Sequence, residues 1–330
     1  MEINSLELLC LDKLRQGKNL LAFSAGTDST ALFFLLMQHK ISFDIAIVDY
    51  QLRQQSKQEI AYAKELAQKY HKKIYIKSAP LTPPSIEEKA RKIRYDFFSS
   101  IIKKEMYDNL ITAHQLNDQF EWFLMQFAKG AGVVELLGME PCTEKEHFTI
   151  VRPLLFVSRD EIVLYLQKHK IKYFTDTSNF DQNFTRNFIR HNFSDPFIKK
   201  FAAGVKRSFH YLLEDKKLLE NEIFRQKELY FARRTGSSYQ DKRVLDKIFK
   251  RFGYLLSTSQ KEEIFRQKEG VIASKFAFVL TEHFIIVAPY IITPIPKKIR
   301  EIYRKHKIPK ILRGYFFAER ISPTLFDRLL

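Results

Sequence analysis

Short apolar runs alternate with amphipathic stretches through the first half of the chain. The apolar runs, which we expect to form buried strands, are residues 20–23, 43–48, 73–76 and 109–113. The stretches with helical spacing are residues 29–39, 56–70 and 115–129. Another helix is expected to begin near Ser85, because Ser85 and Glu88 have the spacing of a capping box. Strands that alternate with helices predict an α/β fold with a doubly wound, mainly parallel sheet. Ligands of such sheets bind at the carboxyl ends of the strands.

The pattern changes near residue 192. Long, charged helical stretches without strands follow, then two strand-like runs at 276–281 and 284–288, and then a basic segment at 297–313. We therefore expect three domains: a catalytic domain over 1–192, a helical domain over 193–272 and a small basic α+β module over 273–330.

One heptapeptide, Glu-Ile-Phe-Arg-Gln-Lys-Glu, occurs at 222–228 and again at 263–269. Two copies are too few to stack into a solenoid, which needs about three repeats. We therefore expect two similar amphipathic helices.

Composition indicates a polyanionic partner. The 330 residues include 55 Lys and Arg against 38 Asp and Glu, which gives a net charge of +17. Such a surplus attracts tRNA, other nucleic acids or acidic membranes, unless it only reflects a lysine-rich proteome.

Several classes of protein are poorly supported by the sequence. Cys10 and Cys142 are the only cysteines and form no CxxC pair, which disfavours a disulfide framework, a zinc ribbon or an iron–sulfur cluster. No apolar run reaches the roughly 20 residues that span a bilayer. The acidic, amphipathic N-terminus does not resemble a signal peptide. We expect no membrane partner and a cytoplasmic location.

A polar turn follows the first predicted strand. Ser24, Thr27 and Ser29 offer hydroxyl donors, Gly26 lets the backbone approach a phosphate, and the following helix presents its N-terminus. The Asp28 carboxylate would repel phosphate unless a cation such as Mg²⁺ lay between them. The alternative is a turn in which Asp28 or Ser29 only caps the helix.

A second cluster follows the fourth predicted strand. His114, Asp118 and Glu121 are spaced so that they share one face of a helix. Two such carboxylates can hold an ammonium group by charge-assisted hydrogen bonds. A solvated acidic helix face is the alternative, and a zinc site is disfavoured because no HExxH pattern is present.

These clusters resemble known motifs. Ser24 to Ser29 is similar to the SGGxDS pyrophosphate loop of the PP-loop ATPases, with Ala25 in place of the first glycine. Residues 113–121, AHQLNDQFE, resemble the AHxxxDQxE motif of tRNA(Ile)-lysidine synthetases, which are PP-loop enzymes. Tyr50 and Gln51 replace the usual His and Gly of that family's VDHGLR segment.

Further stretches match that family in the same order along the chain. They are residues 87–95 (with Arg91 and Arg94), 129–132, 152–155 with Arg159, 176–179, Arg186 with Asn187, Arg190, and 307–313. The matches cover about residues 19–192, and most of 193–330 matches weakly.

The resemblance implies an adenine nucleotide alpha hydrolase-like fold and a ligase. The enzyme would transfer AMP from ATP to C2 of the wobble cytidine of a CAU-anticodon tRNA(Ile), and L-lysine would then attack to give lysidine. The implied catalytic residues are Asp28, His114, Asp118, Glu121 and Arg186. The implied ATP-binding residues are Ser24, Ala25, Gly26, Thr27, Asp28, Ser29 and Arg94, with Mg²⁺ on Asp28. Asp118 and Glu121 would bind lysine. The implied tRNA-binding residues are Arg190, Lys297, Lys298, Arg304, Lys305, Lys307 and Arg313.

Two other functions stay open at this point, a PP-loop tRNA thiolase and a non-catalytic RNA-binding protein. A thiolase would rely on cysteines, whereas an RNA-binding protein would leave the loop and the carboxylate pair without a purpose. The sequence also leaves open whether the chain forms a homodimer.

Overall fold

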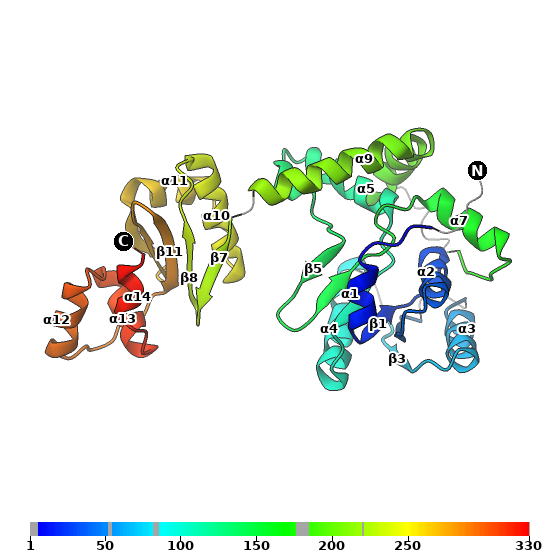
Figure 1. Cartoon of the computed structure of the whole chain (residues 1–330), viewed down its shortest axis with the longest axis horizontal. Helices are drawn as coiled ribbons and strands as arrows, with labels where there is room; N and C mark the ends of the chain where they lie inside the picture. The colour runs from blue at the N-terminus through cyan, green and yellow to red at the C-terminus, as the bar shows by residue number, and fades with distance from the viewer. Residues whose placement is uncertain (1–5, 52–54, 82–85, 176–184, 220, 330) are drawn as a thin grey trace. The chain divides into compact units, whose positions relative to one another are not determined.

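The computed structural model describes residues 6–51, 55–81, 86–175, 185–219 and 221–329. The chain divides into two compact units, Met1–Lys217 and Leu218–Leu330. Each unit is built on its own sheet (Figure 1).

The first unit contains a six-stranded sheet in the order β3-β2-β1-β4-β6-β5. Its strands are β1 (Asn19–Ala22), β2 (Asp44–Asp49), β3 (Ile74–Ser78), β4 (Asn109–Ile111), β5 (Cys142–Glu144) and β6 (Thr149–Val151). Neighbouring strands are parallel except for β5 and β6. The predicted doubly wound, mainly parallel sheet is therefore confirmed.

Helices cover both faces of this sheet because successive strand residues point to opposite sides. Leu21 and Ile45 pack in the core formed with α1, α2, α3 and α7, whereas Leu20 and Ala46 pack against α4. These helices are α1 (Leu11–Gln16), α2 (Thr27–Gln38), α3 (Gln55–Lys69), α4 (Ile86–Glu105) and α7 (Arg159–Lys168). All of these strand residues are fully buried, as expected for a parallel sheet covered on two sides.

A third layer of helices adjoins the end of β4. It consists of α5 (Leu116–Phe127), α6 (Val133–Leu136), α8 (Thr185–Ile189), the π-helical turn η2 (Arg190–Ser194) and α9 (Asp195–Leu219). Leu116 of α5, Leu137 and Phe209 of α9 share one apolar cluster. This packing holds the first turn of α5 at the carboxyl end of β4.

The second unit contains a five-stranded antiparallel sheet, β7-β8-β11-β10-β9. Its elements are β7 (Ile223–Gln226), β8 (Leu229–Arg233), α10 (Ser238–Arg251), α11 (Thr258–Gln267), β9 (Glu269–Ile272), β10 (Phe276–Leu280), β11 (Phe284–Pro289), α12 (Lys297–Lys305), α13 (Lys310–Ala318) and α14 (Thr324–Asp327). Phe278 and Ile285 pack against α10 and α11, whereas Ala277 and Ile286 pack against α12, α13 and α14.

The expectation of a strand-free region over 193–272 is wrong. That region includes β7 and β8, which pair with the sheet of the second unit, and β9. The unit boundary at Lys217 and Leu218 accordingly lies inside the stretch that we expected to be a single helical domain. The sequence of β7 shows no alternation of buried and exposed positions, since only Ile223 is partly buried and Phe224, Arg225 and Gln226 are exposed.

The two copies of the heptapeptide adopt different structures. The copy at 263–269 completes α11, which a capping box at Ser257 and Gln260 begins and the buried Ile264 anchors. The copy at 222–228 contains β7, in which Ile223 lies opposite Ala232 of β8. The prediction of two similar helices is therefore wrong for the first copy, because pairing with β8 overrides the local preference.

Within the part of the chain that the structure describes, no helix has the length and apolar character needed to cross a membrane.

Candidate active site

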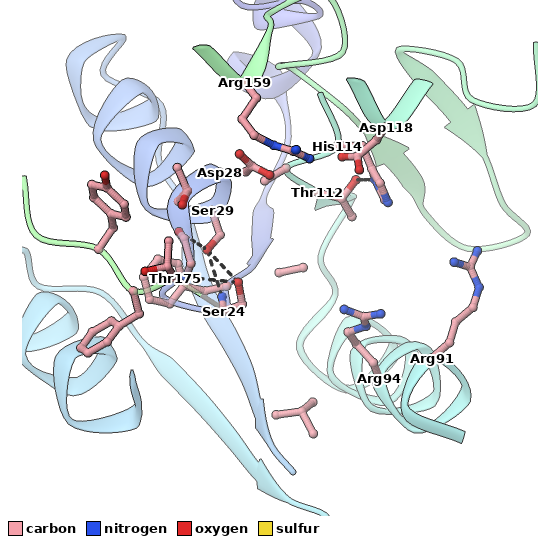
Figure 2. A pocket seen from close by; sticks show the side chains of 18 of the residues that line it. Ser24, Asp28, Ser29, Arg91, Arg94, Thr112, His114, Asp118, Arg159 and Thr175 are labelled. Atoms are coloured by element: carbon pink, nitrogen blue, oxygen red, sulfur yellow. Dashed lines mark hydrogen bonds between the residues drawn. The ribbon is translucent and has the colours of Figure 1, made fainter. Parts of the chain in front are cut away.

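The polar turn lies between β1 and α2. The Ser24 amide donates to Ser29 Oγ at 3.2 Å, the two serine hydroxyls are 3.0 Å apart, and Ser29 Oγ donates to the Gly26 carbonyl at 3.2 Å. Gly26 is the N-cap of α2. Figure 2 shows dashed lines for the hydrogen bonds between Ser24 and Ser29. The hydroxyl groups of the turn and the positive end of the α2 dipole thus face the same pocket.

Ala25 adopts a backbone conformation that favours glycine. Its φ is 60°, its side chain is fully buried, and its carbonyl accepts a hydrogen bond from the Phe174 amide at 3.0 Å. A left-handed conformation costs a non-glycine residue roughly 1–2 kcal/mol. Gln51, which stands where the resembling family usually has glycine, also has a positive φ of 53°. Both replacements of a family glycine, Ala25 and Gln51, therefore fall at positions where the backbone is left-handed and the residue bears the strain.

Asp28, in the first turn of α2, is held in an unfavourable environment for a carboxylate. Burial raises its pKa to about 7, and the nearby charges of Asp118 and Glu121 add to the rise, while Arg159 and Arg190 oppose it. Its Oδ1 atom is buried and has no hydrogen-bond partner among the described residues. A cation beside this oxygen would favour the ionised form.

His114 follows β4, and its Nδ1 is 3.0 Å from Thr112 Oγ1. Burial lowers its pKa to about 4; Asp118 opposes the shift, and Arg152, Arg186 and Arg94 add to it. The ring is therefore neutral at pH 7 and can act as a hydrogen-bond donor or acceptor.

Asp118 and Glu121 lie on α5 as predicted, whereas the prediction is wrong for His114, which precedes the N-cap Gln115 and is not on the helix. Both carboxylates are held by arginines. Arg186 donates from Nη2 to Asp118 Oδ1 and from Nε to Glu121 Oε2, each at 2.9 Å. Arg190 donates from Nε to Glu121 Oε1 at 2.7 Å and from Nη2 to Oε2 at 3.1 Å. The pair that we expected to hold an ammonium group holds two guanidinium groups in the structure.

The two carboxylates differ in access. Glu121 has no exposed surface, whereas Asp118 lines the pocket. Burial alone would raise the pKa of Asp118, but Arg186, His114, Arg159 and Arg190 outweigh it and lower the pKa. Asp118 also accepts from the Gln115 amide in the capping box of α5. Asp118 is thus an ionised group that borders the cavity, with Glu121 behind it.

A brace that the sequence did not reveal supports this cluster. Arg159 Nη1 donates to both carboxylate oxygens of Asp195, at 3.1 and 2.9 Å, and its amide donates to Asn117 Oδ1 at 3.1 Å. Asn117 in turn donates from Nδ2 to Asp195 Oδ1 at 2.7 Å. Arg159 and Asp195 both line the pocket. No local spacing signals this brace, because its members come from α5, α7 and α9.

These groups surround one cavity of about 610 Å³ in the first unit, a size typical of small-ligand pockets. Figure 2 shows Ser24, Asp28 and Ser29 on one side, Arg91 and Arg94 on α4, and Arg159, His114 and Asp118 beyond them. The lining includes the predicted residues Ser24, Gly26, Thr27, Asp28, Ser29, Arg94, His114, Asp118 and Arg190. Ala25, Glu121 and Arg186 are not among the lining residues. Tyr173, Phe174 and Thr175, which the sequence did not single out, are among them.

Arg190 and Arg313 differ from the exposed tRNA contacts that we expected. Arg190 is buried in the pocket wall. Arg313 of α13 is only partly exposed and donates from Nε to the Ile308 carbonyl at 2.8 Å, so it stabilises the turn before its own helix. The other predicted tRNA contacts are all exposed, in or directly after α12; they are Lys297, Lys298, Arg304, Lys305 and Lys307.

Some sequence predictions fall outside the described residues. They are the capping residue Ser85, Leu52 and Arg53 of the segment after β2, and the motif at 176–179. Among the residues that the structure describes, no group of three or more His, Cys, Asp or Glu side chains could hold a metal ion.

The sheet, the turn after β1 and the pocket at the carboxyl ends of the strands define a PP-loop ATPase domain. The model of the PP-loop domain family matches residues 3–196. In fold, the chain is similar to a U34-tRNA thiolase, NcsA from Methanococcus maripaludis, with a TM-score of 0.52 and 18% identity over 62% of this chain and 74% of that one. At that identity the likeness shows the fold alone.

Relatives of known function are much more similar. The chain is 45% identical over 318 residues to the tRNA(Ile)-lysidine synthase of Campylobacter jejuni strain RM1221, covering 96% of this chain and 97% of that protein. It is 40% identical over 324 residues to the tRNA(Ile)-lysidine synthase of Helicobacter pylori strain 26695, covering 97% and 95%. The chain belongs to the tRNA(Ile)-lysidine synthase family. It is therefore an ATP-dependent ligase that modifies tRNA.

Proposed function

We propose that the chain joins lysine to the wobble cytidine of a CAU-anticodon tRNA(Ile) in the cytoplasm. ATP first transfers AMP to the C2 oxygen of the cytidine and releases pyrophosphate. The side-chain amine of lysine then attacks C2 and expels AMP, which leaves lysidine. The observation that carries this proposal is a single cavity in which a phosphate-binding turn, two arginines of α4 and an ionised aspartate face one another.

The turn from Ser24 to Ser29 is suited to bind the pyrophosphate part of ATP. It offers hydroxyl groups beside the N-terminus of α2, a helix of 12 residues. Arg91 and Arg94 reach the same cavity from α4 and can contact phosphate oxygens.

Asp28 is the residue that would hold Mg²⁺. Its unpartnered, buried Oδ1 is a hard oxygen ligand, and magnesium in nucleotide sites is commonly bound by one or two carboxylates together with phosphate oxygens. Bound there, Mg²⁺ would supply neutralisation of the charge that develops on the pyrophosphate.

Asp118 is the better placed of the two α5 carboxylates to bind the lysine substrate, since it borders the cavity. Glu121 is enclosed by guanidinium groups, which suits a positioning residue that orients Arg186 and Arg190. His114, neutral and hydrogen-bonded, would orient a phosphate or the base. This arrangement refines the lysine-binding pair that the sequence suggested.

The exposed cations of α12 would bind the tRNA backbone. Tyr303 and the neighbouring Ile308 and Leu312 are buried, which turns Lys298, Arg304 and the other basic residues of α12 outward. Phosphate contacts of this kind add affinity without sequence specificity.

A thiolase function finds no support in the cavity. Cys10 and Cys142 are both described, and neither is among the residues that line it. A non-catalytic RNA-binding role would not require a buried aspartate beside a phosphate-binding turn.

The test is to incubate the protein with ATP, labelled lysine and unmodified CAU-anticodon tRNA(Ile). Incorporation of label into the tRNA, with one AMP released per lysine, supports the proposal. Failure of lysine to enter the tRNA while ATP is consumed would refute it. Asp118→Asn should raise the KM for lysine more than it lowers the rate of adenylation, with Glu144→Gln on the exposed end of β5 as the matched control.

A further inference from the structure

The two cysteines lie side by side although 132 positions separate them in the sequence. Cys10 is the N-cap of α1, and Cys142 is the first residue of the edge strand β5. Their Sγ atoms are 2.7 Å apart and share a hydrogen bond, and both cysteines are free thiols. Each is half-buried against the main core of the first unit.

We propose that Cys10 and Cys142 form a thiol–disulfide modification site, which a low-molecular-weight disulfide converts to an intramolecular disulfide. The proposal is independent of the lysidine reaction, because neither cysteine lines the cavity.

The backbone holds both thiols in place from the same strand end. The Leu9 amide donates to the Pro153 carbonyl at 3.0 Å, and the Arg152 amide donates to the Pro141 carbonyl at 2.8 Å. The residue before each cysteine is therefore hydrogen-bonded to a two-residue stretch directly after β6. Two thiols fixed in this way react as if at very high local concentration.

The surroundings give the two thiols different roles. The hydrogen bond with Cys10 lowers the pKa of Cys142 to about 7; burial opposes this, and Lys13 and Arg152 assist it. The hydrogen bond with Cys142, together with burial, raises the pKa of Cys10. Cys142 is thus the thiolate that attacks first, and Cys10 is the thiol that resolves the intermediate.

The proposed reaction is an exchange with a disulfide RSSR. The Cys142 thiolate attacks one sulfur of RSSR, forms a mixed disulfide and expels RS⁻, which takes up a proton. Cys10 then loses its proton, attacks Cys142 Sγ and expels the second RS⁻. Two protein thiols are oxidised to one disulfide, and RSSR is reduced to two RSH.

The test uses the full chain and glutathione disulfide as the probe. After incubation at neutral pH, the wild-type protein should lose both titratable thiols. Its mass should fall by two hydrogens, and it should carry no glutathione adduct. Peptide mapping should locate the bond between Cys10 and Cys142, and dithiothreitol should reverse it. The bond would close a long loop, so the Tm of the oxidised form should rise by roughly 5–10 °C.

Two serine variants test the roles. Cys10→Ser should stop at the mixed disulfide and carry one glutathione on Cys142, whereas Cys142→Ser should react at least about tenfold more slowly. Equal reaction rates for the two variants would overturn the assignment of Cys142 as the nucleophile. Two thiols that remain titratable in excess glutathione disulfide, separate glutathione adducts on both cysteines, or only intermolecular disulfides would overturn the site itself.

Discussion

Arg190 and Glu121 face each other through two hydrogen bonds, Nε to Oε1 at 2.7 Å and Nη2 to Oε2 at 3.1 Å. This bidentate contact fixes the plane of the guanidinium group. Arg186 approaches Glu121 Oε2 as well, at 2.9 Å. A carboxylate without exposed surface therefore orients two arginines, one of which lines the cavity.

Removing this carboxylate should destabilise the protein strongly. Glu121→Ala would remove the buried carboxylate that accepts two hydrogen bonds from Arg190 and one from Arg186, and the free energy of unfolding should fall by about 3–5 kcal/mol. Urea denaturation measures the change. Glu144→Ala, at an exposed position of β5, is the control and should change it by less than about 0.5 kcal/mol. Equal effects of the two substitutions would contradict the anchoring role of Glu121.

Asp28 should make stability depend on pH. Its pKa is raised to about 7 in the folded protein from an ordinary value of 3.8, so the folded state binds more protons between those values. Stability should therefore decline as pH rises from about 4 to about 7, and level off above that. Thermal melts without Mg²⁺ should show a shallower decline for Asp28→Asn. Parallel profiles for the variant and the wild type would be inconsistent with a buried, protonated Asp28.

Asp28→Asn should also slow the transfer of AMP from ATP to the cytidine. Asparagine keeps the size of Asp28 but carries no charge to hold a cation against pyrophosphate, so the release of pyrophosphate from ATP should fall at least about 100-fold. A single-turnover assay with ATP and tRNA measures this loss. Thr27→Ser, which keeps a hydroxyl in the same turn, should remain active.

His114 should stay neutral throughout the physiological range. Its folded pKa is about 4, well below the unfolded value of 6.5, so its ring signals should not titrate between about pH 5.5 and 8 in an NMR experiment. His114→Gln identifies the signals by their disappearance. Because the unfolded state binds the proton more readily, this histidine should lower stability as pH falls from about 6.5 toward 4. A midpoint near 6.5 would contradict the buried environment.

The basic face of α12 should control the salt dependence of tRNA binding. Substituting Lys298, Arg304 and Lys305 by alanine should reduce the slope of log K against log salt by roughly one for each phosphate that is no longer neutralised. Filter binding over a range of salt concentrations measures the slope. Lys250→Ala on α10, which packs on the opposite face of the sheet, should leave the slope unchanged. If the wild type, the α12 variant and Lys250→Ala gave equal slopes, the exposed cations of α12 would not bind the tRNA backbone.

Local patterns were sufficient to predict most of the first unit. The four strands predicted there lie within about two residues of their observed limits. A buried strand followed by an amphipathic helix can be recognised from a short stretch of sequence. The sequence also singled out Asp28 and Asp118, which line the cavity, because both follow strand ends. The contacts of Glu121 with Arg186 and Arg190 were not predictable, since 65 and 69 positions separate the partners. Cys10 and Cys142 were missed as a pair because they too are distant in the sequence.

The repeated heptapeptide has a consequence for how secondary structure is specified in this chain. Seven identical residues form a strand at 223–226 and the end of a helix at 263–267. The free-energy difference between helix and strand that is intrinsic to these residues must therefore be small. Burial of a single side chain or one ladder of hydrogen bonds contributes more. A synthetic peptide of this sequence should be disordered in water, because a helix of this length does not nucleate and a lone strand has no partner. Circular dichroism of the free peptide would show neither of its two native forms.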